Sequence, residues 1–263
     1  MSDLDLDLYL GGVGLFTPGF ADAAAYAAGA RDPAARLPRA EVLPAALRRR
    51  ATPLAAMVAE AVAQAAAQAD LDLGRVAIVF GSALGEFGIA ATMLGEFRQG
   101  EGLPSPTRFH NSVHNGPAAY LSIATGNRGF STAVAAGPET PAAALLEAAA
   151  LLGERGGAAV VVLADEPPPA PFPQDPAYPP LAVAFALRAA PEPSDRAVLR
   201  ALRGGGARAQ KEAPRVRPEL AGHPCAGAVA LLEAIGRGAE GPVDLGGAPG
   251  RGWTVTVVSR STP

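Results

Sequence analysis

Short apolar runs that alternate with alanine-rich helical segments constrain the fold of this chain more than any other feature. Two runs, residues 75–80 and residues 158–163, have the composition of strands buried on both faces, and Gly81 follows the first of them. Residues 130–134 form a further strand-like run, and residues 141–152 between these runs have a helical pattern. The strand–helix alternation predicts an α/β layered fold around a mostly buried central sheet.

Other segments extend this pattern on both sides. Residues 4–10 alternate leucine with aspartate or tyrosine and predict a strand with one buried face, followed by Gly11, Gly12 and Gly14. Thr52-Pro53 predicts the start of a helix that runs to about Asp70, with threonine as its N-cap. Further helices are predicted at residues 89–97, 111–124 with a bend or restart at Gly116-Pro117, and 225–235, and further strands at 181–187, 198–202 and 253–258.

Two segments lack any such periodicity. Eight of the fourteen residues from Pro167 to Pro180 are proline, which predicts a stiff extended connector, because proline fixes φ and removes a hydrogen-bond donor. Residues 204–220 are rich in glycine, arginine and proline and are predicted to be mobile.

Length and composition exclude several classes of protein. A chain of 263 residues that is 49% hydrophobic supports one domain, or one and a half, with a sizeable core. The net charge of −3 and the lack of clustered basic residues argue against nucleic-acid binding. Cys225 is the single cysteine, so no intrachain disulfide forms. The acidic N-terminus lacks signal-peptide features, and no uncharged apolar run reaches about 20 residues, so we expect a cytoplasmic protein without a membrane span.

Residues 105–126 carry a resemblance to a known family. They read Ser-Pro-Thr-Arg-Phe-His-Asn-Ser-Val-His-Asn-Gly-Pro-Ala-Ala-Tyr-Leu-Ser-Ile-Ala-Thr-Gly. Together with Gly81-Ser-Ala-Leu-Gly85, this segment resembles the N-terminal half of β-ketoacyl synthases, in the short form found with bacterial aryl polyene and polyketide pathways. The resemblance implies a thiolase-like layered fold with one near-complete N-terminal half at residues 1–190. Residues 191–263 would then be a truncated second half made of a mobile loop, a short helix and a final strand.

A nucleophile is missing where the resemblance requires one. Synthases that condense acyl chains carry a cysteine where a strand turns into a helix, because the helix N-terminus lowers the pKa of the thiol and stabilises an oxyanion. The corresponding stretch here, Ser131 to Pro141, contains no cysteine. Counting back from the helix places the nucleophile position within five residues, none of which has a nucleophilic side chain: Val134, Ala135, Ala136, Gly137 and Pro138.

The resemblance without the nucleophile implies a non-catalytic subunit similar to a chain-length factor. Such a subunit pairs with a full-length, cysteine-bearing ketosynthase as a heterodimer, closes the acyl channel and limits the length of products built on acyl carrier protein. No condensing activity alone, no cofactor and no metal are expected. The resemblance places six residues at the channel and dimer interface: Phe109, His110, Asn111, Ser112, His114 and Asn115.

Two other functions stay open from the sequence. One is a divergent acyltransferase or hydrolase that uses Ser131, Thr132, Thr140 or Cys225 as its nucleophile, although a hydroxyl without an adjacent base is a poor one. The other is a scaffold protein that binds acyl chains. A half-fold leaves a large apolar face, which either meets a partner or is covered by the C-terminal segment from Leu220 to Val258.

The remaining histidines allow a functional and a structural interpretation. His223, in Gly222-His-Pro-Cys-Ala-Gly227, loosely matches the family's Gly-His-x-x-Gly-Ala motif and is a remnant of a catalytic histidine or a packing residue. A nucleophilic pair of His223 and Cys225 is disfavoured, because helix positions i and i+2 do not face each other. His110 and His114 have a spacing that can bind a metal on a helix, but no third ligand is evident, which favours a packing role.

Overall fold

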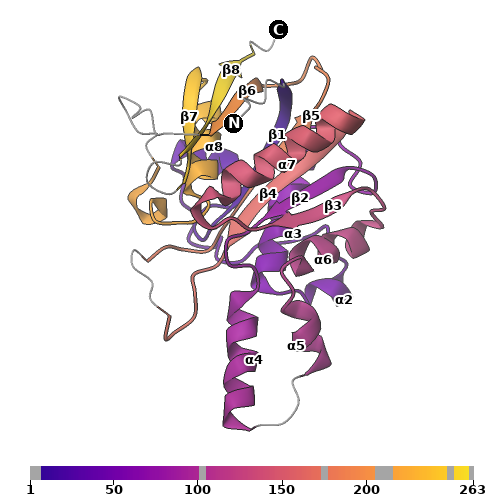
Figure 1. Ribbon diagram of the computed structural model, residues 1–263, viewed down its shortest axis with the longest axis vertical. Helices are drawn as coiled ribbons and strands as arrows, with labels where there is room; N and C mark the ends of the chain where they lie inside the picture. Colours follow the sequence, from indigo (N-terminus) through magenta and orange to yellow (C-terminus); the bar gives the residue numbers. More distant parts are fainter. Residues whose placement is uncertain (1–6, 101–104, 173–176, 205–215, 248–251, 261–263) are drawn as a thin grey trace.

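The computed structural model describes residues 7–100, 105–172, 177–204, 216–247 and 252–260. In these residues eight strands form one sheet in the order β3-β2-β4-β5-β1-β6-β8-β7, in which β2 runs parallel to β3 and β4 and the other neighbours are antiparallel (Figure 1). The strands are β1 (Leu8–Phe16), β2 (Ala77–Gly81), β3 (Ser131–Val134), β4 (Ala158–Asp165), β5 (Leu181–Arg188), β6 (Ala197–Gly204), β7 (Gly241–Gly246) and β8 (Trp253–Ser259).

Helices cover both faces of this sheet. They are α1 (Ala23–Ala28), α2 (Ala45–Arg48), α3 (Pro53–Gln68), α4 (Phe87–Gln99), α5 (Pro106–Asn111), α6 (Gly116–Thr125), α7 (Thr140–Arg155) and α8 (Ala226–Gly236). Along β4, Val161 and Leu163 pack in one apolar cluster with α7 and α8, whereas Val160 and Val162 pack in a second cluster with α3 and α6. The predicted α/β layered fold with a buried central sheet is therefore confirmed.

Most predicted elements form close to their expected positions. Thr52 is the N-cap of α3, since its hydroxyl accepts a hydrogen bond from the Ala55 N–H at 2.9 Å. The helical pattern at residues 111–124 is divided between α5 and α6, which restarts at Gly116 as predicted. The described parts of the proline-rich connector, residues 167–172 and 177–180, contain no helix or strand. Most of the loop predicted to be mobile, residues 205–215, lies outside the described residues.

The first strand differs from its prediction in extent and burial. β1 continues through its glycines to Phe16, and both of its faces are buried; residues 4–6 lie outside the described residues. The glycines are strand residues because α3 packs directly on them. A Cβ at Gly12 would lie 2.2 Å from the Ala65 carbonyl oxygen, and one at Gly14 would lie 2.0 Å from that of Ala61. Glycine here permits a close approach of helix and sheet, not a turn.

Gly14→Ala is expected to lower the free energy of unfolding by about 1–3 kcal/mol, because the added methyl group forces α3 away from β1. Gly88→Ala is the matched control, since nothing lies within 4 Å of a Cβ at this helical position. That variant should be stabilised by about 0.5–1 kcal/mol. Urea denaturation of both variants measures the difference, and equal stability would contradict the close-packing interpretation.

The C-terminal segment extends the sheet beyond β1 and supplies a helix to its core. β7, at Gly241–Gly246, was not predicted, because only Val243 and Leu245 in it are buried and apolar. Buried side chains of α8, among them Val229 and Leu231, belong to the same apolar cluster as α7. The C-terminal segment thus covers this face of the sheet, which the sequence left open. The domain division at residue 190 stays a prediction, and strands from both sides of it share one sheet.

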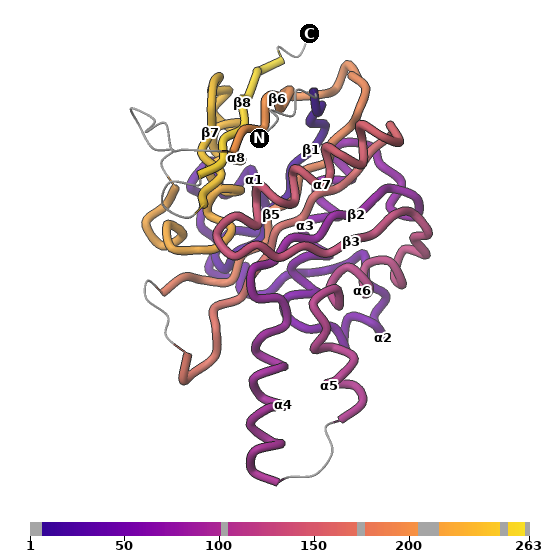
Figure 2. The backbone as a smooth tube through the Cα atoms, viewed as in Figure 1, coloured from indigo at the N-terminus to yellow at the C-terminus, as the bar shows by residue number. Residues whose placement is uncertain are grey.

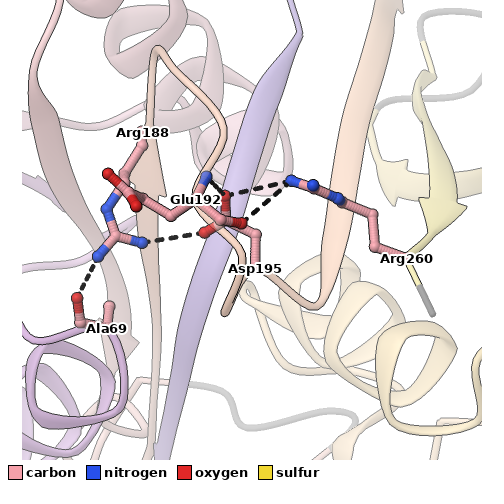
Figure 3. Close-up of polar contacts among 5 residues, drawn as sticks. All are labelled: Ala69, Arg188, Glu192, Asp195 and Arg260. Atoms are coloured by element: carbon pink, nitrogen blue, oxygen red, sulfur yellow. Dashed lines mark hydrogen bonds and ion pairs between the residues drawn. The ribbon is translucent and has the colours of Figure 1, made fainter. Parts of the chain in front are cut away.

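A buried ion pair fastens the turn between β5 and β6 to two distant elements (Figure 3). Asp195 accepts hydrogen bonds from Arg188 Nη1 at 2.9 Å, from the Glu192 N–H at 2.6 Å and from Arg260 Nη1 at 3.4 Å. The Arg188 guanidinium also donates to the carbonyl of Ala69, the residue that follows α3. The side chain of Asp195 is fully buried, so this cluster joins β5, α3 and the end of β8 inside the protein.

Helices α4 and α5 form an arm that projects from one end of the sheet (Figures 1 and 2). The two helices pack against each other, and Arg108 of α5 forms an ion pair with Glu96 of α4. Leu94 is 68% exposed on this arm and Phe97 is 53% exposed. The arm thus presents apolar side chains to solvent.

Candidate functional site

The predicted nucleophile position lies at the junction between β3 and α7. β3 ends at Val134, and residues 137–139 form a single 3-10 turn before α7 begins at Thr140. The Thr140 hydroxyl is buried; it donates to the Gly137 carbonyl at 2.7 Å and accepts from the Ala136 N–H at 3.0 Å. The junction therefore presents no thiol, and its one hydroxyl, that of Thr140, is hydrogen-bonded to backbone groups.

A hollow of about 580 Å³ opens beside β3, which is one of the two edge strands of the described sheet. Its lining comes from β3, α6 and the residues just before α6: His114, Asn115, Ala119, Ser122, Ser131, Thr132 and Ala133. Two predicted interface residues, His114 and Asn115, therefore lie at this hollow. The hydroxyls of Ser131 and Thr132 form no hydrogen bond with a histidine in the described structure, which leaves them without an activating base.

The other predicted interface residues lie on or next to α5. Phe109 is 63% exposed, and the Ser112 hydroxyl donates to its carbonyl. Asn111 is buried and accepts from the Tyr120 hydroxyl at 3.0 Å, and the His110 ring also contacts the Tyr120 ring. The six residues are thus neighbours with different surroundings, and their role in an interface stays a prediction.

The His110 and His114 spacing does not produce a metal site. α5 ends at Asn111, so the two histidines do not share a helical face. The Nε2 atom of His114 lies 2.9 Å from the Ser82 carbonyl oxygen, and its ring contacts Phe80. Within the described ranges, no group of three or more His, Cys, Asp or Glu residues could hold a metal ion. No helix in those ranges is long and apolar enough to span a membrane.

A buried carboxylate, missed by the sequence analysis, organises the loop that leads to the arm. Asp165, at the end of β4, accepts hydrogen bonds from Ser82 Oγ at 2.7 Å and from the Ala83 and Leu84 N–H groups at 2.9 and 2.8 Å. Cys225 Sγ lies 3.5 Å from its second oxygen. Burial raises the pKa of Asp165 above its usual value. The available signal was an acidic residue two positions after the apolar run at 158–163.

His223 and Cys225 contact each other, but through the backbone. His223 Nδ1 accepts the Cys225 N–H at 2.9 Å, so the ring proton is on Nε2, 3.3 Å from the Asp165 carbonyl oxygen. The Tyr178 ring meets His223 edge-on at 4.7 Å. Burial lowers the pKa of His223 to about 4 and raises that of the Cys225 thiol well above its usual range. Neutral imidazole and neutral thiol describe a packed structural pair, not a nucleophile with its base.

Cys225 is expected to resist thiol reagents in the native protein at neutral pH, because the thiol is fully buried and its pKa is raised. Labelling with a thiol-reactive acyl mimic should be slow in buffer and fast in denaturing urea, as followed by mass spectrometry. Rapid stoichiometric labelling of the native protein would instead favour Cys225 as the nucleophile of a divergent enzyme.

Glu86 is a second buried carboxylate, at the base of the arm. It precedes α4, is only 4% exposed and accepts a hydrogen bond from the Thr52 hydroxyl at 2.5 Å. Burial, aided by the charge of Glu166 and opposed by the hydrogen bond from Thr52, raises the pKa of Glu86 to about 7. Since Thr52 also caps α3, Glu86 links the starts of two helices.

Protein stability should fall as the pH rises through the titration range of Glu86. Its pKa rises from 4.5 to about 7 on folding, so between these values the folded protein holds a proton that the unfolded chain has released. The expected loss by pH 8 is about 3 kcal/mol. Glu86→Gln should remove this contribution, whereas Glu154→Gln, at an exposed position on α7, should retain it. Urea denaturation from pH 5 to pH 8 tests this, and parallel curves for Glu86→Gln and the parent protein would contradict it.

Comparison with known proteins identifies the family. A family model described as the N-terminal domain of β-ketoacyl synthase matches residues 23–235, which run from the start of α1 into α8. The chain belongs to the β-ketoacyl synthase family. No curated protein matches it.

Solved structures of this family share the fold. The chain is similar to a structure of a ketosynthase in complex with its chain length factor from Xenorhabdus doucetiae, with 21% identity, 95% of this chain and 99% of that chain covered, and a TM-score of 0.72. It is also similar to the ishigamide ketosynthase/chain length factor, with 15% identity, coverages of 97% and 99%, and a TM-score of 0.67. At these identities the likeness establishes the fold, so the predicted thiolase-like architecture is confirmed.

Proposed function

We propose that this member of the β-ketoacyl synthase family is a non-catalytic subunit similar to a chain-length factor. It would pair with a cysteine-bearing ketosynthase in the assembly of fatty acid, polyketide or aryl polyene chains on acyl carrier protein. The observation that carries the proposal is the junction of β3 and α7, where residues 134–138 offer no nucleophile and the Thr140 hydroxyl is bonded to the backbone.

The single thiol of the chain does not replace the missing nucleophile. Cys225 is buried before α8, and its thiol lies against the Asp165 carboxylate, which disfavours the thiolate. His223 is equally buried, and its ring nitrogens face the Cys225 N–H and the Asp165 carbonyl. These contacts support a structural role for His223 and argue against an acyltransferase or hydrolase built on this pair.

The surface around the arm and β3 supports a partner subunit. β3 is an edge strand with partly exposed side chains, and an unpaired strand edge is a template for pairing with another chain. The hollow lies beside this strand, and the arm carries three exposed apolar side chains: Leu94, Phe97 and Phe109. An open strand edge and exposed apolar side chains both favour burial against another protein. Among the solved neighbours, three have names that combine a ketosynthase with a chain length factor.

Light scattering after co-expression with a full-length ketosynthase from the same genome tests the proposal. We expect the mass of a one-to-one heterodimer. Phe109→Asp should weaken this complex, whereas Leu37→Asp, at a 79% exposed position between α1 and α2, should not. A monomer or homodimer that does not bind the co-expressed ketosynthase would overturn the proposal and favour an acyl-binding scaffold.

A second test concerns the nucleophile position itself. Val134→Cys and Ala135→Cys introduce a thiol near α7 without supplying a nearby base in the described structure. Neither variant alone should condense acyl groups with malonyl units on acyl carrier protein. Measurable condensation by either purified variant would contradict the non-catalytic assignment.

A further inference from the structure

A pocket of about 280 Å³ lies where the segment after β1 meets the segment before α8. Its lining residues are Thr17, Pro18, Phe20, Tyr26, Arg31, Pro179, Arg217, Glu219 and Leu220. Figure 2 shows α1 and α8, which flank these two segments in the chain, in the same part of the molecule. The pocket shares no lining residue with the hollow beside β3, so it is a separate feature and its argument does not rest on the proposed function.

The floor of the pocket is apolar and rigid. Phe20 and Tyr26 are almost fully buried, and their rings meet edge-on with centroids 5.2 Å apart. Leu220 is 1% exposed. The Thr17 hydroxyl donates to the Pro180 carbonyl at 2.9 Å, which connects the segment after β1 to the end of the proline-rich connector. Pro18 and Pro179 are partly exposed beside this floor, and their apolar surface suits a planar or compact apolar group.

Two guanidinium groups lie over this floor. The Arg31 guanidinium carbon is 5.1 Å from the centroid of the Phe20 ring, and that of Arg217 is 4.8 Å from it. Arg217 lies equally close to the Tyr26 ring and donates to the Tyr26 carbonyl at 3.0 Å. Two positive charges therefore lie beside one ring, and an anion placed near both would be attracted to them.

Within the described structure, these two charges are only partly compensated. Arg31 pairs with Glu219, but Arg217 forms no ion pair among the described residues. Two guanidinium groups and one carboxylate among the lining residues give the pocket a net charge of +1. The Arg217 guanidinium has five N–H donors, and four of them remain after the bond to the Tyr26 carbonyl. Four donors are enough for the two parallel N–H contacts that a carboxylate accepts.

We propose that this pocket binds a small carboxylate carried on an apolar or aromatic body. The carboxylate would pair with Arg217 and Arg31, and the apolar body would lie against Pro18 and Pro179, two partly exposed apolar residues of the lining. A single negative charge matches the excess charge of the pocket. An inorganic phosphate matches it less well, since it has no apolar part for the two prolines and its second charge would lie beside Glu219.

Ligand-observed NMR on the full-length protein tests the assignment, with benzoate as the probe, and with benzamide and inorganic phosphate as comparisons at constant ionic strength. We expect saturable benzoate binding that benzamide and phosphate fail to reproduce. Arg217→Gln should weaken benzoate binding by about tenfold or more, because a charge-assisted pair is lost. Arg31→Gln should weaken it as well, and this exposed position provides a second variant if Arg217→Gln fails to fold.

Arg75→Gln is the matched control, since this arginine is exposed two residues before β2 and does not line the pocket. Its benzoate affinity should equal that of the parent protein. Absence of saturable benzoate binding, equal binding of benzamide or phosphate, or an equal loss in Arg75→Gln would each overturn the proposal.

Discussion

Replacing Asp195 with alanine is expected to lower the free energy of unfolding by about 3–5 kcal/mol, because it leaves a buried arginine without its carboxylate. The Arg188 side chain is only 14% exposed, and that of Asp195 is fully buried. Arg188 also passes directly over Gly11, where a Cβ would lie 2.4 Å from Arg188 Nη1. The guanidinium is therefore confined and has little freedom to move toward solvent when Asp195 is removed (Figure 3).

Urea denaturation measures this loss, with two comparison proteins. Asp7→Ala removes the carboxylate of an exposed pair with Arg200, which should cost about 1 kcal/mol or less. The double variant Arg188→Met with Asp195→Ala removes both charges and should regain much of the lost stability. If Asp195→Ala costs no more than Asp7→Ala, the buried cluster does not stabilise the fold as we infer.

Replacing Asp165 with alanine should cost a similar amount, about 3–5 kcal/mol, since it leaves several buried donors without an acceptor. The Ala83 and Leu84 N–H groups and the Ser82 hydroxyl all donate to this carboxylate. Part of the cost is offset because burial already penalises the charge of Asp165, as its raised pKa indicates. Asp165→Asn retains one acceptor and should cost less than Asp165→Ala.

The Asp165 variants also test how the loop before the arm is held. The Ser82 carbonyl oxygen bonds to Nε2 of His114, which lines the hollow beside β3, and the Ser82 hydroxyl accepts a hydrogen bond from the Gly85 N–H at 2.7 Å. The loop therefore connects Asp165 with that hollow. Hydrogen exchange of residues 82–86 should accelerate in Asp165→Asn while exchange in α3 stays unchanged. Unchanged exchange throughout this loop would show that other contacts hold it.

Local sequence patterns were sufficient for the elements with strong periodicity. The threonine–proline start of α3 and the apolar runs of β2 and β4 are determined by residues close together in the chain, so capping and burial signals identified them. The ketoacyl-synthase resemblance and the absence of a cysteine between β3 and α7 were likewise readable from the sequence. The family and its fold could therefore be predicted.

The burial and extent of β1 and β7 could not be predicted from local pattern. The predicted strand ended at Leu10, before the glycines, and only contact with α3 explains why Gly12 and Gly14 continue the strand. β7 has two apolar residues, and its pairing with β8 depends on a segment that follows it in the chain. In both cases the deciding contacts are with residues of other elements.

The sequence by itself determined the layered α/β class, the family and the lack of a nucleophile at the start of α7. Tertiary structure alone decided which polar groups meet. Ser82 and Asp165 are 83 residues apart in the chain, Cys225 is a further 60 from Asp165, and Tyr26 and Arg217 are separated by 191 residues. Such contacts depend on how the strands are ordered in the sheet and on where α8 packs, because a buried polar group is satisfied by whatever the fold brings beside it.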